Sequence, residues 1–171
     1  MDSLDENTSG FTVYQGPQNH SLQISRAVKC RELLPQQKRH VILVVDDDSF
    51  NVEGLKALLS LLCSVPQVHC AFDGQQALTV LQSLAYRVDL VITDFQMPVM
   101  NGVRFAQELR QLQEDGVAPS RLQIAVASGM NLANEDQSFV IDGRMRPLFD
   151  HRMQKPFSSR ELKRLLDDLA V

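Results

Sequence analysis

The chain has 171 residues, 44% of them hydrophobic, and a net charge of −4, which suits one globular domain with a full core and a tail. No apolar stretch approaches the roughly 20 residues that span a bilayer, the polar start 1–6 is unlike a signal peptide, and the charge balance argues against nucleic-acid binding. We therefore expect a cytoplasmic (intracellular) chain with no nucleic-acid or membrane partner, whose oligomeric state the sequence does not indicate.

Residues 1–38 have the composition of a flexible tail or linker. They contain polar stretches such as Asn-Thr-Ser-Gly and Gln-Gly-Pro-Gln-Asn, and their apolar residues are not clustered. A short helix over about 22–34 is the one regular element that the pattern allows there. We expect a single domain over residues 39–171, where apolar residues recur with regular spacing.

Strand and helix patterns alternate from residue 40 onward. The apolar run 41–45 predicts a buried strand, and leucines at helical spacing predict a helix over 49–63. A short strand over 67–72 follows. The segment Asp73–Gln76 resembles a capping box, which indicates the start of a second helix. The run 88–93 then predicts a third strand.

The second half of the domain continues the alternation. We expect a helix over 102–113, a strand over 122–127 and a helix over about 132–141. A weak strand near 150–154 comes next. The capping box Ser158–Glu161 indicates the start of a last helix, whose leucines follow the i, i+3, i+4, i+7 spacing of an amphipathic helix.

Five strands alternating with five helices indicate an α/β fold with a parallel sheet covered on both faces. Two strand orders fit this pattern: the flavodoxin-like order 2-1-3-4-5 and a half-Rossmann arrangement. A Rossmann domain needs GxGxxG after its first strand, whereas this chain has Asp46-Asp47-Asp48 there, and three carboxylates would repel a pyrophosphate. We therefore expect a flavodoxin-like, doubly wound, five-stranded parallel sheet of order 2-1-3-4-5.

The flavodoxin-like order brings the carboxyl ends of four strands to the edge where open α/β sheets bind ligands. These ends carry Asp46 and Asp47, Asp94, Ser128, and Lys155. Clustered carboxylates need a cation, and Mg²⁺ suits a site with few protein ligands. The cation would keep Asp94 ionised and nucleophilic. The metal and Lys155 would neutralise a transferring phosphoryl group, to which the Ser128 hydroxyl could donate.

Four short segments carry these residues, and their order and spacing follow a family pattern. They are Val-Val-Asp-Asp-Asp-Ser-Phe-Asn (44–51), Asp-Phe-Gln-Met-Pro-Val-Met-Asn-Gly (94–102), Ala-Ser-Gly (127–129) and Lys-Pro-Phe (155–157). With them, residues 40–171 resemble the receiver domain of two-component response regulators. The resemblance implies that Asp46, Asp47 and Asp94 hold Mg²⁺, together with the backbone carbonyl of Gln96.

The resemblance also implies a role in phosphorelay signalling. Asp94 would accept a phosphoryl group from the phosphohistidine of a sensor histidine kinase or of a histidine phosphotransfer protein. Ser128 and Lys155 would sense the phosphoryl group and couple it to a conformational switch. Any catalysis would be limited to self-phosphorylation and autodephosphorylation at Asp94, so the chain would be an enzyme only in a non-classical sense.

Two features depart from the family pattern. Relatives usually carry an aromatic residue three positions before the lysine, where this chain has Arg152 beside His151. The segment 129–150 is also longer than usual. Because this region is the usual signalling surface of the family, we expect an unusual output surface. Asp48 stands where many members carry Asn, and we expect it to cap a helix rather than to bind metal.

Two other functions remain open at this point. A phosphohydrolase of the haloacid-dehalogenase type would use Asp46 as its nucleophile, although the segment after Asp46 lacks the final Thr or Val of that family's pattern. A phosphorylation-independent interaction module is the second alternative, favoured by the altered region around Arg152. The sequence also does not distinguish a stand-alone receiver from a fragment of a hybrid kinase.

Overall fold

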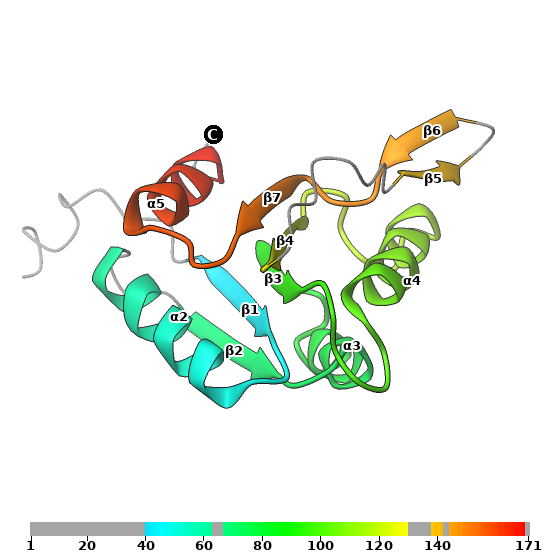
Figure 1. Ribbon diagram of the computed structural model, residues 1–171. Helices are drawn as coiled ribbons and strands as arrows, with labels where there is room; N and C mark the ends of the chain where they lie inside the picture. Colours follow the sequence, from blue (N-terminus) through cyan, green and yellow to red (C-terminus); the bar gives the residue numbers. More distant parts are fainter. Residues whose placement is uncertain (1–39, 63–66, 130–137, 142–143, 170–171) are drawn as a thin grey trace, which may run out of the picture. The chain divides into compact units, whose positions relative to one another are not determined.

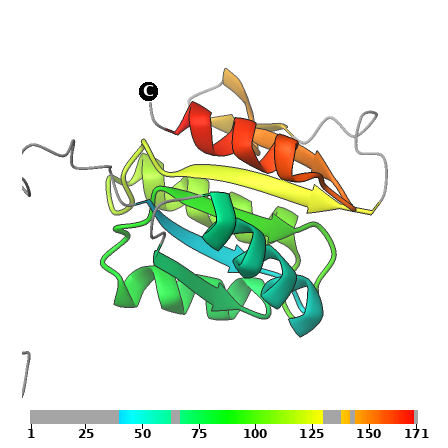
Figure 2. The same cartoon turned by 90° about the vertical axis from the view of Figure 1, so that its left-hand side faces the viewer.

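The computed structural model describes residues 40–62, 67–129, 138–141 and 144–169, so the expected tail and its short helix lie outside the described residues. Five parallel strands form one sheet, and Figure 2 shows them pointing in the same direction. In spatial order they are β2 (Gln67–Ala71), β1 (Val41–Val45), β3 (Leu90–Asp94), β4 (Gln123–Ser128) and β7 (His151–Gln154). This order confirms the flavodoxin-like 2-1-3-4-5 prediction, with β7 as the fifth strand.

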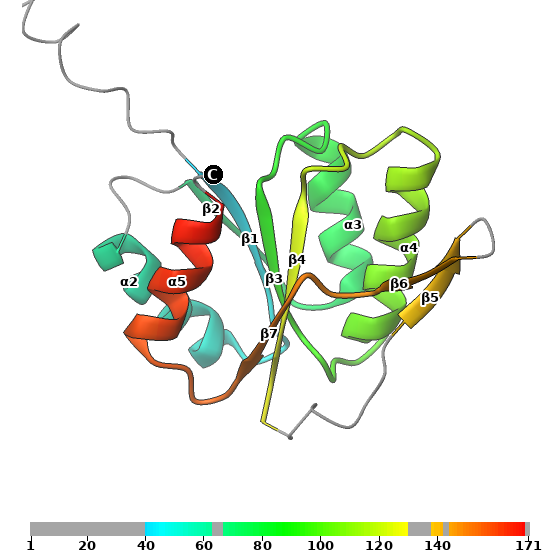
Figure 3. The ribbon, with the colours of Figure 1, turned by 90° about the horizontal axis from the view of Figure 1, so that it is seen from above.

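Helices cover both faces of the sheet (Figure 3). Alternate side chains of each strand point to opposite faces, so the strands contribute to two separate apolar clusters. Val44 and Ile92 pack in the cluster on one face, whereas Leu43 and Val91 pack in the cluster on the other. The helices are α2 (Ser49–Leu62) and α5 (Ser159–Asp168) on the first face, and α3 (Gly74–Ser83) and α4 (Gly102–Glu114) on the second.

Side-chain caps fix where α3, α4 and α5 begin. The Asp73 carboxylate accepts a hydrogen bond of 2.8 Å from the backbone of Gln76 at the start of α3. Ser158 and Glu161 form the expected capping box of α5. Asn101 caps α4 in the same way as Asp73 caps α3. Among the described residues, no helix is long and apolar enough to cross a membrane.

The expected helix over 132–141 is wrong where the structure describes it. Strands β5 (Ser138–Ile141) and β6 (Arg144–Pro147) form a separate antiparallel pair, so the described part of the chain has four helices rather than five (Figure 1). The sequence between these strands is Asp-Gly, and it follows Phe-Val-Ile. Asp-Gly between β-forming residues is a strong hairpin signal, which outweighs the helical spacing of the apolar residues.

The predicted strand near 150–154 forms, although His151 and Arg152 are polar. Asp150 fixes its start: the Asp150 backbone N–H donates to the carbonyl of Ile124 at 2.8 Å, and the Asp150 carboxylate accepts from the N–H of Ile124 at 2.7 Å. The guanidinium of Arg110 on α4 lies 2.9 Å from the same carboxylate. These bonds hold the edge strand β7 against β4 and thereby position the residues that follow it.

Candidate functional site

The acidic residues predicted to form a site come together at the carboxyl edge of the sheet. Asp46 and Asp47 follow β1 directly, and Asp94 is the last residue of β3. The two strands are neighbours, with Val45 paired to Thr93. Each of the three carboxylates offers an oxygen within 4.8 Å of the others. Such a group of oxygens is the ligand set that a hard divalent cation prefers.

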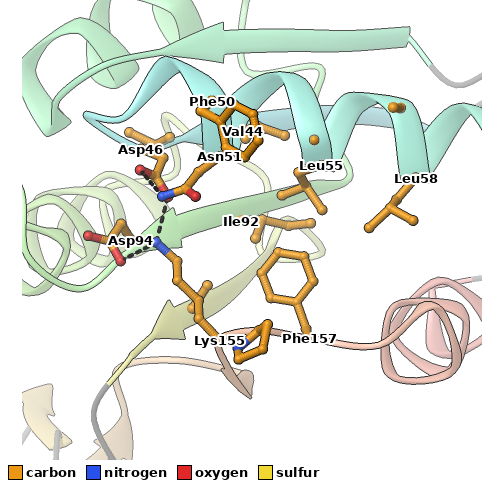
Figure 4. Close-up of a pocket in the computed structure, with 15 residues that line it drawn as sticks. Val44, Asp46, Phe50, Asn51, Leu55, Leu58, Ile92, Asp94, Lys155 and Phe157 are labelled. Atoms are coloured by element: carbon orange, nitrogen blue, oxygen red, sulfur yellow. Dashed lines mark hydrogen bonds and ion pairs between the residues drawn. The ribbon is translucent and has the colours of Figure 1, made fainter.

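Hydrogen bonds hold the Asp46 carboxylate, which is 6% exposed. Its Oδ1 accepts from the backbone N–H of Asp48 at 3.0 Å and from the side-chain amide of Asn51 at 3.1 Å. The Asp48 carboxylate accepts instead from the backbone N–H of Phe50 at 2.9 Å, which confirms its expected capping role at the start of α2. The first turn of α2 therefore orients Asp46 toward the cluster (Figure 4).

Lys155 lies between two of the acids (Figure 4). Its ammonium nitrogen is 2.6 Å from Oδ2 of Asp46 and 2.7 Å from Oδ1 of Asp94. Burial alone would lower the pKa of Lys155, but the hydrogen bonds to the two carboxylates and their charges raise it above the usual value. The Lys155 backbone N–H donates to the carbonyl of Ser128 at 2.7 Å, and the Lys155–Pro156 peptide bond is cis.

The backbone of Asp94 is held by residues whose contribution the sequence did not reveal. The buried Thr93 hydroxyl donates to the carbonyl of Asp94 at 3.0 Å, and the N–H of Gln96 donates to the Asp94 side chain at 3.3 Å. At Gly102, a Cβ atom would lie 2.1 Å from the carbonyl oxygen of Asp94. Only glycine fits there, so the start of α4 packs directly against the backbone of Asp94.

Ser128 stands one strand away from Asp94, on the buried end of β4. Asp94 pairs with Ala127, and Ser128 is the next residue, with a side chain 3% exposed. Every predicted site residue therefore lies on the loops and strand ends that meet at this edge. Ser128 also pairs with Gln154 of β7, two residues beyond the exposed Arg152.

An apolar groove adjoins the acids and was not anticipated from the sequence. It has a volume of about 630 Å³ and lies between α2 and the segment that follows β7. Phe50, Leu58 and Phe157 form part of its walls, and Asp94 and Lys155 lie at one end (Figure 4). Sequence spacing gave no direct signal for it, because the walls come from segments far apart in the chain.

A family model for the response regulator receiver domain matches residues 42–167. The chain belongs to this family. The match confirms the resemblance and the two-component signalling class that the motifs predicted. The match also spans β5 and β6, so the hairpin lies within the receiver domain of this chain.

Among curated proteins, the sensor histidine kinase RcsC of Salmonella typhi is 35% identical over 126 residues, which cover 74% of this chain and 12% of RcsC. The sensor kinase CckA of Brucella abortus is 37% identical over 75 residues, or 44% of this chain and 8% of CckA. The transcriptional regulatory protein CpxR of Klebsiella pneumoniae is 32% identical over 124 residues, which cover 71% of this chain and 45% of CpxR. The chain thus spans less than half the length of these relatives.

Solved structures of receiver proteins share the fold. The response regulator TrrA of Thermotoga maritima, solved in complex with Mg²⁺-BeF, is 28% identical with a TM-score of 0.60, over 76% of this chain and 98% of TrrA. The chemotaxis response regulator CheY4 of Vibrio cholerae is 22% identical with a TM-score of 0.60, over 77% of this chain and 99% of CheY4. Both likenesses agree with the flavodoxin-like sheet described above.

Proposed function

We propose that residues 39–171 form a phosphoacceptor receiver domain in which Asp94 takes a phosphoryl group from a phosphohistidine, with Mg²⁺ as the cofactor. One observation carries the proposal: Lys155 contacts both Asp46 and Asp94 in a cluster of three carboxylates at the carboxyl edge of the sheet. A cation beside a nucleophilic carboxylate is what phosphoryl transfer requires, because negative charge accumulates on the transferring group.

The residues present fit a magnesium ion. Asp46, Asp47 and Asp94 would supply carboxylate oxygens, the backbone carbonyl of Gln96 would supply a further ligand, and waters would complete the shell. When bound, Mg²⁺ would offset the negative charge of the transferring phosphoryl group. The fixed hydrogen bonds to Oδ1 of Asp46 preorganise that carboxylate for this role.

The chemistry of the chain itself is a single displacement. A carboxylate oxygen of Asp94 attacks phosphorus, the P–N bond to the donor imidazole breaks, and the imidazole nitrogen keeps the electron pair and takes up a proton. Lys155 pairs with the new phosphoryl oxygens, and the Ser128 hydroxyl donates to one of them. Phosphorylation replaces the single negative charge of the Asp94 carboxylate with a phosphoryl group that carries about −1.5 to −2. This group keeps Lys155 paired at Asp94, draws the Ser128 hydroxyl toward it and so switches the end of β4.

The exposed face of α2 favours a macromolecular donor. Phe50, Gly54, Ala57 and Leu61 follow one face of this helix, at i, i+4, i+7 and i+11. All four are exposed, and Phe50 and Leu61 keep 84% and 81% of their surface in solvent. The stripe is continuous with the groove that leads to Asp94. A helix that carries the phosphohistidine of a kinase or phosphotransfer protein would cover it.

The proposal is tested by intact-mass measurement after incubation of the full chain with Mg²⁺ and acetyl phosphate. We expect a gain of one phosphoryl group in the wild type, and none in Asp94→Asn or when a chelator removes Mg²⁺. Asp48→Asn is the matched control, because asparagine caps a helix as well as aspartate does, and it should be phosphorylated like the wild type. Equal phosphorylation of Asp94→Asn, or no phosphorylation at all, would contradict the proposal.

A further inference from the structure

Val99 occupies a strained turn in the loop between β3 and α4. Its φ is +63°, a region that β-branched residues rarely adopt. The N–H of Met100 donates to the carbonyl of Pro98 at 2.7 Å, which closes a γ-turn around Val99. A γ-turn with positive φ at its central residue is the rare and strained form. The backbone here suits glycine or asparagine better than valine.

The surrounding structure holds this turn in place. Met97 and Met100 are buried on either side, 9% and 7% exposed. The carbonyl of Met100 accepts a hydrogen bond of 3.0 Å from Gly74, and Asn101 caps α4 immediately afterwards. Strain of this kind persists only where neighbouring contacts determine the backbone. The turn is therefore rigid, and it presents Val99 at a fixed position.

The side chain of Val99 contributes almost nothing to the core. It is 85% exposed, whereas both methionines beside it are buried. The residue before it, Pro98, lines a hollow of about 330 Å³ together with Asp47 and Gln96. Val99 thus directly follows one wall of a hollow that a carboxylate of the cluster also lines, in the loop that leaves β3 after Asp94. Its surface becomes stabilising only when another apolar surface covers it.

We propose that Val99 is a specificity-determining contact for the protein that donates the phosphoryl group, an inference that rests on the function proposed above. A rigid apolar side chain loses little conformational entropy on binding, so its burial adds directly to the affinity of the complex. A small phosphodonor presents no apolar surface that could cover Val99. The contact therefore favours a donor protein over small phosphodonors, and favours donors that are apolar where they meet this turn.

The test compares two donors on the full chain. A panel of purified, phosphorylated histidine kinases and histidine phosphotransfer proteins is first screened against the wild type. The protein that phosphorylates the wild type fastest serves as the protein donor, and phosphoramidate serves as the small donor. In Val99→Asn we expect kcat/KM for the protein donor, relative to the phosphoramidate rate, to fall about tenfold, mainly through KM. Val99→Ile keeps the apolar side chain and should retain the wild-type ratio.

Val117→Asn is the matched control, since Val117 is also an exposed valine but lies between α4 and β4, at the opposite edge of the sheet. In Val117→Asn, the ratio of kcat/KM for the protein donor to the phosphoramidate rate should equal that of the wild type. A wild-type ratio in Val99→Asn would overturn the inference and leave the role of Asp94 intact. An equal loss with both donors would also overturn it, because Val99 would then act by positioning Asp94. If no protein in the panel phosphorylates the wild type while phosphoramidate does, the proposed donor and this inference both fail.

Discussion

The ammonium nitrogen of Lys155 lies 2.7 Å from Oδ1 of Asp94, although the two residues are 61 positions apart. The same nitrogen reaches Asp46 at 2.6 Å. One side-chain cation therefore stabilises two carboxylates of the cluster expected to bind Mg²⁺. Lys155 and a divalent cation compete for part of the same negative charge, and several consequences of this competition can be measured.

Replacing Lys155 should separate metal binding from phosphorylation. In Lys155→Gln, we expect the affinity for Mg²⁺ to rise by roughly three- to tenfold, because a competing positive charge is lost. Phosphorylation by acetyl phosphate should slow at saturating Mg²⁺, because the charge that pairs with the phosphoryl oxygens is missing. Calorimetric titration with Mg²⁺ measures the first effect. Lys56→Gln, which removes an exposed lysine paired with Glu53, should leave Mg²⁺ affinity unchanged.

The stability of the metal-free protein should depend on Lys155 at alkaline pH. Burial lowers the pKa of Lys155, but its hydrogen bonds to Asp46 and Asp94 and the charges of these carboxylates outweigh burial. The pKa of Lys155 in the folded protein is therefore raised above the usual 10.5. Because the protonated lysine is favoured in the folded state, it stabilises the fold fully at any pH below its unfolded-state pKa. This stabilisation is lost as the pH rises through its folded-state pKa. Between about pH 9 and about pH 12, the wild type should lose more unfolding free energy in urea than Lys155→Gln. Equal losses would contradict the ion-pair assignment.

Gly102 should tolerate no side chain. Gly102→Ala places a Cβ atom 2.1 Å from the carbonyl oxygen of Asp94, so the start of α4 or the end of β3 must move. We expect a loss of about 2–4 kcal/mol in unfolding free energy and slower phosphorylation of the displaced Asp94. Gly54→Ala is the contrast, because its Cβ meets no atom within 4 Å. In the interior of α2 it should stabilise by about 0.5–1 kcal/mol.

The strain at Val99 should be visible in chemical denaturation. Val99→Gly removes a β-branched side chain from a positive φ, and we expect stability to rise by about 1 kcal/mol. Gly116 has a φ of +72°, and a Cβ atom added there would meet no other part of the fold within 4 Å. Gly116→Val therefore creates the same strain at another loop and should destabilise by about 1–2 kcal/mol. A stability of Val99→Gly that falls by the full entropic cost of glycine, about 0.5–1 kcal/mol, would show that the turn is not strained.

Much of the fold follows from the sequence because buried parallel strands are short apolar runs bounded by polar residues. The runs before Asp46 and Asp94 are of this kind, and each predicted strand forms within a few residues of its expected position. The acidic site could be predicted for a related reason: parallel strands deliver their carboxyl ends to one edge. Asp46 and Lys155 directly follow strands and Asp94 ends one, so the strand order alone predicts that they lie close together.

Other features depend on contacts that local patterns do not encode. The segment before Asp142 is expected to be helical, whereas β5 and β6 form an antiparallel pair, as the Asp-Gly pair between them favours. The constraint on Gly102 comes from the approach of two backbones, and the groove beside Phe50 comes from side chains on separate segments. The positive φ of Val99 is imposed by its buried neighbours, against its own preference.

The position of the phosphoryl group distinguishes Asp94 from Asp46 as the nucleophile. The full chain is incubated with Mg²⁺ and phosphoramidate and then treated with borohydride, which reduces an aspartyl phosphate to homoserine. Peptide mass spectrometry then locates the homoserine. We predict homoserine at position 94 alone, and none without Mg²⁺. Homoserine at position 46, as expected for an Asp46 nucleophile, or at neither position would contradict the assignment of Asp94 as the phosphoacceptor.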